Sequence, residues 1–284
     1  MAFTGQVSFA TYFDMLKMFK DEKSYPVWKE IIKNMSAMKK LLWNDDEVSQ
    51  KFSQFKKDLF SNIMAHIGME AKQGESHLDA SLRTLLITAS NDDQVNQKCM
   101  EIMKNFFENS APVDPEIRGS VYEVYVSKGG LEAYNNMVEL HKKVDSMEEK
   151  TEIEIALGCV EGSKCLELAQ EYMMSSNVRD NEKYKILKGM ATGSKLGRDK
   201  SWKFVQEQWG VFYEKYSESH HLAKIIDAST SNFATKKMLR EVKAFLKNRI
   251  SKNCKRKFNQ CVEKIRNNIQ MWQQNGQALK EYFN

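Results

Sequence analysis

Apolar residues recur at the helical period along nearly the whole of this chain, and this repetition limits its possible folds more than any other feature. In the segment SFATYFDMLKMFK, Phe9, Phe13 and Leu16 share one helical face, and Ser8 is a residue type that commonly caps a helix start. Strand-like alternation over five or more residues is absent from the sequence. Only 3 of the 284 residues are proline, which breaks helices. The pattern therefore predicts an all-α protein.

The same period predicts where later helices lie and where some of them begin or end. Pro26 suits the first turn of a helix over YPVWKEIIKNMSAMKKLLW, and Gly68 suits the end of a helix over EVSQKFSQFKKDLFSNIMAHIG. Further helices are expected over residues 77–90, 93–109, 114–128, 130–143, 146–158, 162–175, 179–192, 198–215, 218–227, 233–247 and 255–283. The breaks between these stretches are short, so consecutive helices should run antiparallel to one another.

Antiparallel helix pairs stacked in chain order form an α-solenoid, whose curvature makes a bowl with a concave binding face. No strict internal repeat is visible, so we expect an irregular array of the HEAT or armadillo kind, with about a dozen or more helices in one domain over residues 1–284. A compact helical bundle is the alternative. The array is favoured because about a dozen serial helices exceed what one bundle core accommodates.

Positive charge is concentrated in residues 236–266, which hold twelve lysines and arginines against Glu241 and Glu263. Such a block can attract nucleic acid, acidic peptides or anionic lipid, although a solvated basic helix face is the alternative. Base stacking is poorly supported, because only Phe245 and Phe258 lie within the run. The densest part of the stretch is a possible basic patch formed by Lys252, Lys255, Arg256 and Lys257.

The segment ATGSKLGRDKSWKFVQEQW, residues 191–209, is the strongest candidate for a phosphate-binding loop, but its spacing is wrong. A Walker A motif needs G-x-x-x-x-G-K-[ST] after a strand, whereas Gly193 and Lys195 follow a helical segment. No H-E-x-x-H zinc helix and no G-x-S-x-G nucleophile motif occurs in the sequence. We therefore predict no catalytic residue, no metal site and no cofactor in this chain.

Cysteine usage and the N-terminal sequence bear on the compartment. The five cysteines form no C-x-x-C pair, which is typical of free thiols in a reducing compartment. The start MAFTGQVSFATYF lacks the basic and apolar regions of a signal peptide, and no stretch reaches a membrane-spanning length. These features predict a cytoplasmic location without membrane association.

Five motifs occur here in an order and spacing that resemble a known family. They are GESHLDASLRTLL, DPEIRGSVYEVYVSKGG, LHKKVDSMEEKTEIEIALG, GSKLGRDKSWKFVQEQWGVFYEKY and MLREVKAFL. With them the chain resembles, from about residue 5 to residue 283, the C-terminal helical domain of puromycin-sensitive-type zinc aminopeptidases, which are related to aminopeptidase N. The resemblance implies an α-solenoid bowl that closes over a separate thermolysin-like catalytic domain.

In that family the zinc helix and the G-A-M-E-N substrate loop belong to the catalytic domain, and neither occurs in this sequence. The resemblance therefore implies a non-catalytic part that covers the active site and accommodates peptides. Its expected partners are peptides and an aminopeptidase catalytic domain, in cis or in trans, with zinc only in that domain. The sequence leaves open whether the chain is a short protein or part of a longer one.

The resemblance also implies that the basic turn in GSKLGR lies near the inner rim of the bowl. There Lys195 and Arg198, with Arg83 and Arg118, could offer positive charge to a peptide carboxylate. The alternative is that Arg83 and Arg118 pair with acids on neighbouring helices, with Asp79 or Glu116 as candidates.

The residues after this turn yield a related expectation. Trp202 and Trp209 lie seven positions apart, so on one continuous helix they share a face, and we expect that face to pack inward. The alternative for the basic turn itself is a hinge that points to solvent and binds nothing.

Two functional hypotheses follow. The first is a non-catalytic helical domain of a zinc aminopeptidase. The second is a helical scaffold or adaptor that binds an acidic partner or nucleic acid through residues 236–266, of which nucleic acid is the less favoured because aromatic residues are few.

Overall fold

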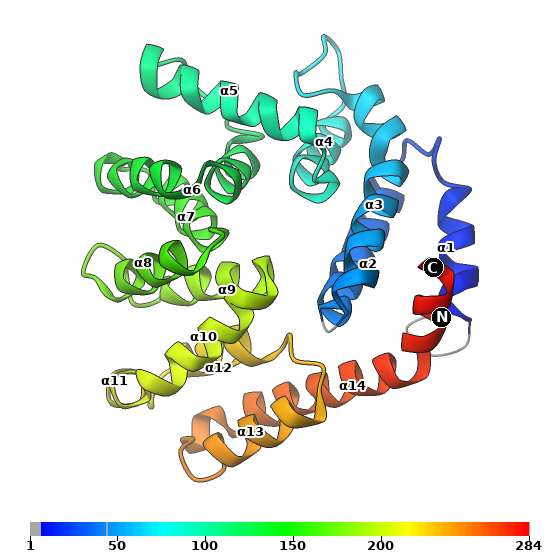
Figure 1. The fold of residues 1–284 in the computed structure, drawn as a ribbon. Coiled ribbons are helices and arrows are strands. Elements are labelled where there is room, and N and C mark those ends of the chain that lie inside the picture. Colours follow the sequence, from blue (N-terminus) through cyan, green and yellow to red (C-terminus); the bar gives the residue numbers. More distant parts are fainter. Residues whose placement is uncertain (1–6, 44, 284) are drawn as a thin grey trace. The chain divides into compact units, whose positions relative to one another are not determined.

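A computed structural model describes residues 7–43 and 45–283, and these residues form helices and no β-strand (Figure 1). The prediction of an all-α, α-solenoid-like fold is therefore confirmed. The α-helices are α1 (Phe9–Lys17), α2 (Tyr25–Leu42), α3 (Asp46–Ile67), α4 (His77–Ser90), α5 (Asp93–Asn109), α6 (Arg118–Lys143), α7 (Met147–Gly158), α8 (Ser163–Met174), α9 (Lys183–Gly193), α10 (Lys195–Glu207), α11 (Trp209–Tyr216), α12 (His220–Thr230), α13 (Lys236–Leu246) and α14 (Lys255–Phe283).

Local sequence explains where several helices begin and end. Ser8 caps α1 by accepting a hydrogen bond from the Thr11 N–H, and Pro26 lies in the first turn of α2, as predicted. Gly68 ends α3 with a φ of 71°, a conformation that glycine adopts without steric cost. The free thiols are also confirmed, because none of the five cysteines forms a disulfide.

At two places the predicted division of the chain into helices differs from the structure. One predicted break lies within a helix, and one predicted helix is divided. The break expected near Gly130 is present as a left-handed residue with a φ of 63°, although α6 continues on both sides of it. The single helix predicted over residues 198–215 is wrong, because it is interrupted at Gln208, which joins α10 to α11. Helical periodicity continues across this junction, so the pattern of apolar residues alone does not reveal the break.

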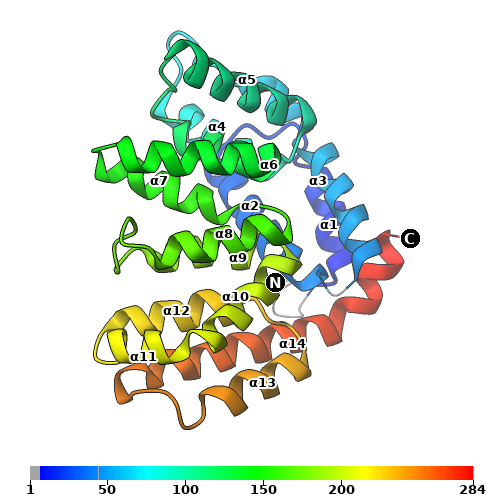
Figure 2. The same ribbon diagram turned by 60° about the vertical axis from the view of Figure 1, so that its left-hand side comes forward.

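The chain divides into two compact units, while its prediction as one helical domain stays a prediction. Unit 1 is defined by residues up to Lys128 together with those from Gln273 onward, and unit 2 is defined by Gly129–Trp272. Within unit 1, α4 packs against both α2 and α3. Within unit 2, α9 packs against α7, α8, α10 and α12, and α7, α8 and α9 can be followed side by side in Figure 2.

An aromatic cluster joins the beginning and the end of the chain in unit 1. The Phe13 ring stacks on Tyr282 with a centroid distance of 5.2 Å and meets Phe283 edge-on at 5.0 Å. Around the cluster, the Tyr282 hydroxyl donates to Asp14 Oδ1 at 2.9 Å. The C-terminal turns of α14 therefore complete the core into which α1 packs.

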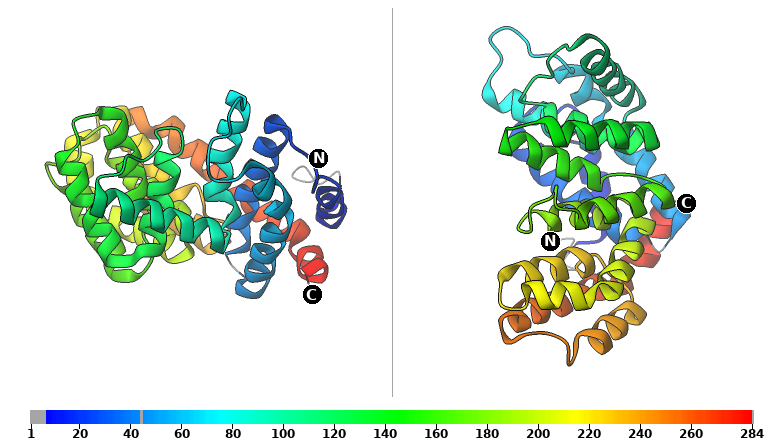
Figure 3. Two further views of the ribbon diagram at one scale, coloured as in Figure 1. Left: turned by 90° about the horizontal axis from the view of Figure 1, so that it is seen from above. Right: turned by 90° about the vertical axis from the view of Figure 1, so that its left-hand side faces the viewer.

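In unit 2 the backbones of α7 and α9 approach each other closely at Gly158 and Gly189. A Cβ atom built on Gly189 would lie 2.7 Å from the Gly158 Cα, and one on Gly158 would lie 2.4 Å from the carbonyl oxygen of Ile186. Both distances are shorter than any ordinary contact, so the crossing requires glycine at each position. The right-hand view of Figure 3 shows the yellow and orange helices of unit 2, where α11 packs against α12.

The glycine crossing predicts the effect of adding a single methyl group to α9. Gly189→Ala should lower the free energy of unfolding by about 1–3 kcal/mol, because the added Cβ overlaps the α7 backbone. Gly193→Ala in the same helix is the matched control, since its Cβ would meet nothing within 4 Å. Urea denaturation of both variants measures the difference, and equal stability of the two would show that the crossing tolerates a side chain.

Candidate functional site

Arg83 is buried and held by the loop that precedes α4, with a side chain that is only 1% exposed. Its Nη1 donates to Glu75 Oε1 at 2.8 Å, its Nη2 donates to Glu75 Oε2, and its Nε donates to the Gly68 carbonyl oxygen at 3.2 Å. The guanidinium hydrogen bonds hold the pKa of Glu75 well below its usual value, at about 2. This bidentate pair fixes the loop from Gly68 to Glu75 against α4.

The pairing of Arg83 with an acid was predicted, but the predicted partners were wrong. Asp79 instead accepts hydrogen bonds from the Ser76 N–H and hydroxyl, because the two residues form the capping box at the start of α4. The hydrogen bonds to Glu75 are the main reason that the Arg83 pKa is raised, whereas Glu116 acts on Arg83 only through its charge. Arg118, the first residue of α6, is half-buried.

Arg198 is also buried, and its position differs from that expected for an exposed basic turn. GSKLGR is not a loop, because Ser194 caps α10 through the Gly197 N–H and the helix begins at Lys195. Arg198 is 1% exposed, donates from Nε to Asp199 Oδ1 at 2.9 Å, and lies over the Phe233 ring at 5.7 Å. Of the two basic residues in GSKLGR, Lys195 is exposed and Arg198 is buried.

The tryptophans that follow the turn pack inward, as expected, although they lie on two helices. Trp202 on α10 and Trp209 on α11 are 4% and 9% exposed. Each ring meets the Phe245 ring edge-on at a centroid distance of 5.5 Å. The Trp202 indole N–H also donates to Glu241 Oε1 at 2.7 Å. Together these contacts attach α13 to α10 and α11.

The four residues predicted to contact peptide are therefore not one exposed group. Arg83 and Arg118 belong to unit 1, and Lys195 and Arg198 belong to unit 2. Both buried guanidinium groups bind carboxylates of the chain itself. Lys195 is exposed and Arg118 is half-buried, and peptide binding at either residue stays a prediction.

The basic stretch 236–266 separates into residues with internal partners and residues that face a pocket. Lys257 and Lys264 pair with Asp227 at 3.6 and 2.9 Å. Burial raises the pKa of this carboxyl, but the hydrogen bond from the Ser231 hydroxyl and the two lysines outweigh burial and lower the pKa to about 2. Arg249 lies over the Phe245 ring at 4.7 Å and donates to the Phe245 carbonyl oxygen. Three of the twelve basic residues in this stretch thus make contacts within unit 2.

Four lysines of the same stretch line one pocket of about 560 Å³. We call it the lysine pocket, and its lining residues are Lys243, Ala244, Lys247, Ile250, Ser251, Lys252, Lys255, Phe258 and Asn259. Lys252 and Lys255 belong to the predicted basic patch, whereas Arg256 is exposed outside the lining. Lys243 and Lys247 were not singled out from the sequence, although their spacing of four residues places both on one helical face.

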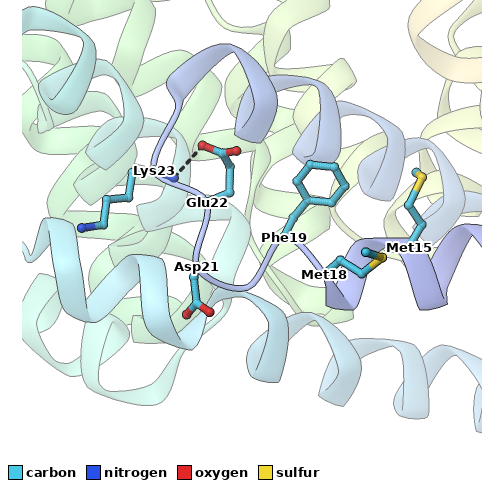
Figure 4. A pocket seen from close by; sticks show the side chains of 6 residues that line it. All are labelled: Met15, Met18, Phe19, Asp21, Glu22 and Lys23. Atoms are coloured by element: carbon cyan, nitrogen blue, oxygen red, sulfur yellow. Dashed lines mark hydrogen bonds between the residues drawn. The ribbon is translucent and has the colours of Figure 1, made fainter.

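A second pocket, of about 600 Å³, lies at the end of α1 in unit 1. Figure 4 shows Met15, Met18 and Phe19 beside the charged residues of the following turn, where the Lys23 N–H donates to Glu22 Oε1 at 2.8 Å. Met18 is 81% exposed, which is unusual for a large apolar side chain. Helical periodicity does not reveal this surface, because Met15 and Met18 lie off the face that Phe9, Phe13 and Leu16 share.

Neither a metal-binding cluster nor a membrane-spanning helix is found among the residues that the structure describes. Residues 7–43 and 45–283 contain no group of three or more histidine, cysteine, aspartate or glutamate residues placed to hold a metal ion. In the same ranges, no helix combines the length and the apolar character that crossing a membrane requires.

Comparisons with known proteins agree on one family. The sequence model of the ERAP1-like C-terminal domain matches residues 1–267. The chain is 21% identical to the alanine/arginine aminopeptidase of Saccharomyces cerevisiae over 99% of its own length, and 24% identical to aminopeptidase M1-A of Oryza sativa over 94%. It is also 24% identical to the puromycin-sensitive aminopeptidase of Caenorhabditis elegans over 98%. The chain spans about a third of the length of these relatives, at 33%, 31% and 30%.

The Arg83–Glu75 pair predicts a pH-dependent contribution to stability. The pKa of Glu75 is lowered from 4.5 to about 2 in the folded protein, so the pair stabilises the fold above about pH 4.5 and loses this effect as the pH falls toward 2. Glu75→Gln should therefore lower the urea midpoint at pH 7 and flatten its decline over that acidic range. Glu70→Gln, at an exposed carboxylate in the same loop, is the control and should leave the midpoint nearly unchanged. Equal effects of the two variants would contradict a stabilising role for the pair.

Proposed function

Because the chain belongs to the ERAP1-like C-terminal domain family, we propose that it serves as the non-catalytic helical part of a zinc aminopeptidase. In this role it covers the active site of a catalytic domain, in cis or in trans, and accommodates the peptide substrate. The observation that carries the proposal is the family match over residues 1–267, which spans nearly the whole chain. The names of the relatives, all aminopeptidases about three times as long, support it.

Peptide contact is proposed for the exposed charge near the start of α10. Lys195 is exposed at the first turn of that helix, where a long flexible side chain reaches a carboxylate without desolvation of a buried group. The buried Arg198 fixes this first turn of α10 through its hydrogen bond to Asp199 and its contact with the Phe233 ring. In unit 1, Arg83 fixes the loop from Gly68 to Glu75 through its hydrogen bonds to those two residues.

Contact with the catalytic domain is proposed for the apolar surface at the end of α1. Met15 and Met18 are 45% and 81% exposed, and beside Phe19 they line the pocket of Figure 4. Exposed methionine adapts to irregular apolar partners, and burying such side chains favours association. The relatives contain about two thirds of additional sequence that this chain does not cover, and a domain from that part is the proposed occupant.

A cytoplasmic location forms part of the same proposal. All five cysteines are free thiols, and four of them are buried. Free thiols are the usual state of cysteine in a reducing compartment.

A scaffold that binds an acidic protein through residues 236–266 remains the alternative, and the lysine pocket is the observation that favours it. Nucleic acid is a weaker candidate, because Phe245 already packs against Trp202 and Trp209 and leaves Phe258 as the one aromatic residue of the stretch that lines the pocket.

A chimera tests the aminopeptidase role directly. In the Caenorhabditis elegans puromycin-sensitive aminopeptidase, this chain would replace the segment that aligns with it, and peptide cleavage would be compared with that of the enzyme lacking the segment. We expect the chimera to cleave longer peptides with a higher kcat/KM than the truncated enzyme, because the helical part helps to hold the substrate. A folded chimera that cleaves no better than the truncated enzyme would contradict the proposal.

The same chimera tests the surface at the end of α1. Met18→Asp should reduce peptide cleavage by about tenfold, because a charge buried against an apolar partner weakens association by more than 1 kcal/mol. Met147→Asp is the matched control, since Met147 is an equally large residue that is 44% exposed at the start of α7. Equal activity of the two variants would exclude Met18 from the contact.

A further inference from the structure

The lysine pocket brings together four positive charges without an acidic residue in its lining. Lys243 and Lys247 come from the end of α13 and the residue after it, and Lys252 and Lys255 come from the start of the next helical segment. Unlike Lys257 and Lys264, none of these four side chains forms an ion pair with a carboxylate among the residues that the structure describes. Beside the pocket, the Asn253 side-chain amide donates to Glu218 Oε2 at 3.5 Å.

The helix that starts at this pocket has an unusual distribution of charge. α14 begins with Lys255, Arg256 and Lys257, and its first turn contains no acidic residue. The N-terminus of a helix carries a partial positive charge, so lysines there are normally unfavourable and acidic residues favourable. The partial positive charge at the N-terminus of this 29-residue helix therefore adds to the charge of the lysines. An anion in the pocket would offset the repulsion among the lysines and the repulsion between the lysines and the helix N-terminus.

Ser251 provides a second and independent feature of the pocket. It lines the pocket and precedes η2 (Lys252–Cys254), the short 3₁₀ helix that leads into α14. Its hydroxyl makes no capping hydrogen bond, and its Oγ is buried without a hydrogen-bond partner. A buried hydroxyl that forms no hydrogen bond costs free energy, so such groups in native proteins call for an explanation. A bound anion would accept that hydrogen bond.

From this arrangement we propose that the lysine pocket binds a compact, multiply charged anion that carries phosphate groups. Lysine ammonium groups bind phosphate as point charges, and several of them around one pocket match a ligand with closely spaced phosphates. The volume of about 560 Å³ is that of a small-molecule site rather than of an extended groove. This inference goes beyond the aminopeptidase role and does not depend on it.

Titration calorimetry with inorganic tripolyphosphate tests the proposal on the whole chain. The wild-type protein should bind tripolyphosphate at low salt, with an affinity that falls as salt is raised, and binding should raise its melting temperature. The double variant Lys247→Ala/Lys255→Ala should weaken binding by about tenfold or more, as expected when two direct charge contacts are lost.

A control variant separates a defined site from general attraction by positive charge. Lys236→Ala/Lys237→Ala removes the same charge from the first turn of α13, and neither residue lines the pocket. This control should bind tripolyphosphate within about twofold of the wild type if the pocket is the site. Absence of binding to the wild-type protein at low salt, or equal losses in the two double variants, would overturn the proposal.

Ser251→Ala supplies a readout that a purely structural role would not produce. Because the hydroxyl has no partner in the unliganded protein, its removal should leave the melting temperature unchanged or raise it. The same variant should weaken tripolyphosphate binding several-fold. A lower melting temperature together with unchanged affinity would show that the hydroxyl serves the fold and not a ligand.

Phosphates of this kind occur on soluble molecules and on lipid headgroups, and a second arm of the experiment distinguishes the two sources. Sedimentation with vesicles that contain phosphatidylinositol bisphosphate is compared with calorimetry on the free anion. Pocket-dependent pelleting identifies a headgroup, and binding of the free anion without pelleting identifies a soluble ligand. Both results support the site provided that the wild-type protein binds tripolyphosphate, whereas pelleting without binding of tripolyphosphate contradicts it.

Discussion

Burial of apolar side chains between neighbouring helices holds each unit together. The described ranges contain no β-strand, so no sheet hydrogen bonds connect one helix to the next. Helix α9 shows this most directly, since it contacts α7, α8, α10 and α12 within unit 2. Gly158 and Gly189 let the backbones of α7 and α9 meet without intervening side chains. The start of α10 is positioned by the same packing, since a Cβ on Gly197 would lie 2.2 Å from the Met190 carbonyl oxygen.

Features that depend on nearby residues could be predicted from the sequence, and those that depend on distant residues could not. Ser8, Pro26 and Gly68 act within one helical turn, so the helix ends that they mark were predictable. The Asp14–Tyr282 hydrogen bond joins residues 268 positions apart, and no periodicity reveals it. The partner of Arg83 was missed for a related reason, because the capping box engages Asp79 and leaves Glu75 as the acid that the guanidinium reaches.

The same distinction applies to the candidate sites. The excess of charge in residues 236–266 is evident from composition, but which lysines pair internally depends on Asp227, which lies on a different helix. The charges that face the lysine pocket belong instead to Lys243, Lys247, Lys252 and Lys255. Both the apolar surface at the end of α1 and the lysine pocket suit binding of another molecule. These surfaces, with the family to which the chain belongs, favour a function based on binding.

We propose that this chain acts by binding and that hydrolysis belongs to a separate catalytic domain. The most direct measurement is an assay of the purified chain with fluorogenic aminoacyl substrates, with and without added zinc, beside a mock purification. The account predicts that turnover equals that of the mock purification under both conditions. Zinc-dependent hydrolysis that co-purifies with the chain and is absent from the mock purification would contradict it.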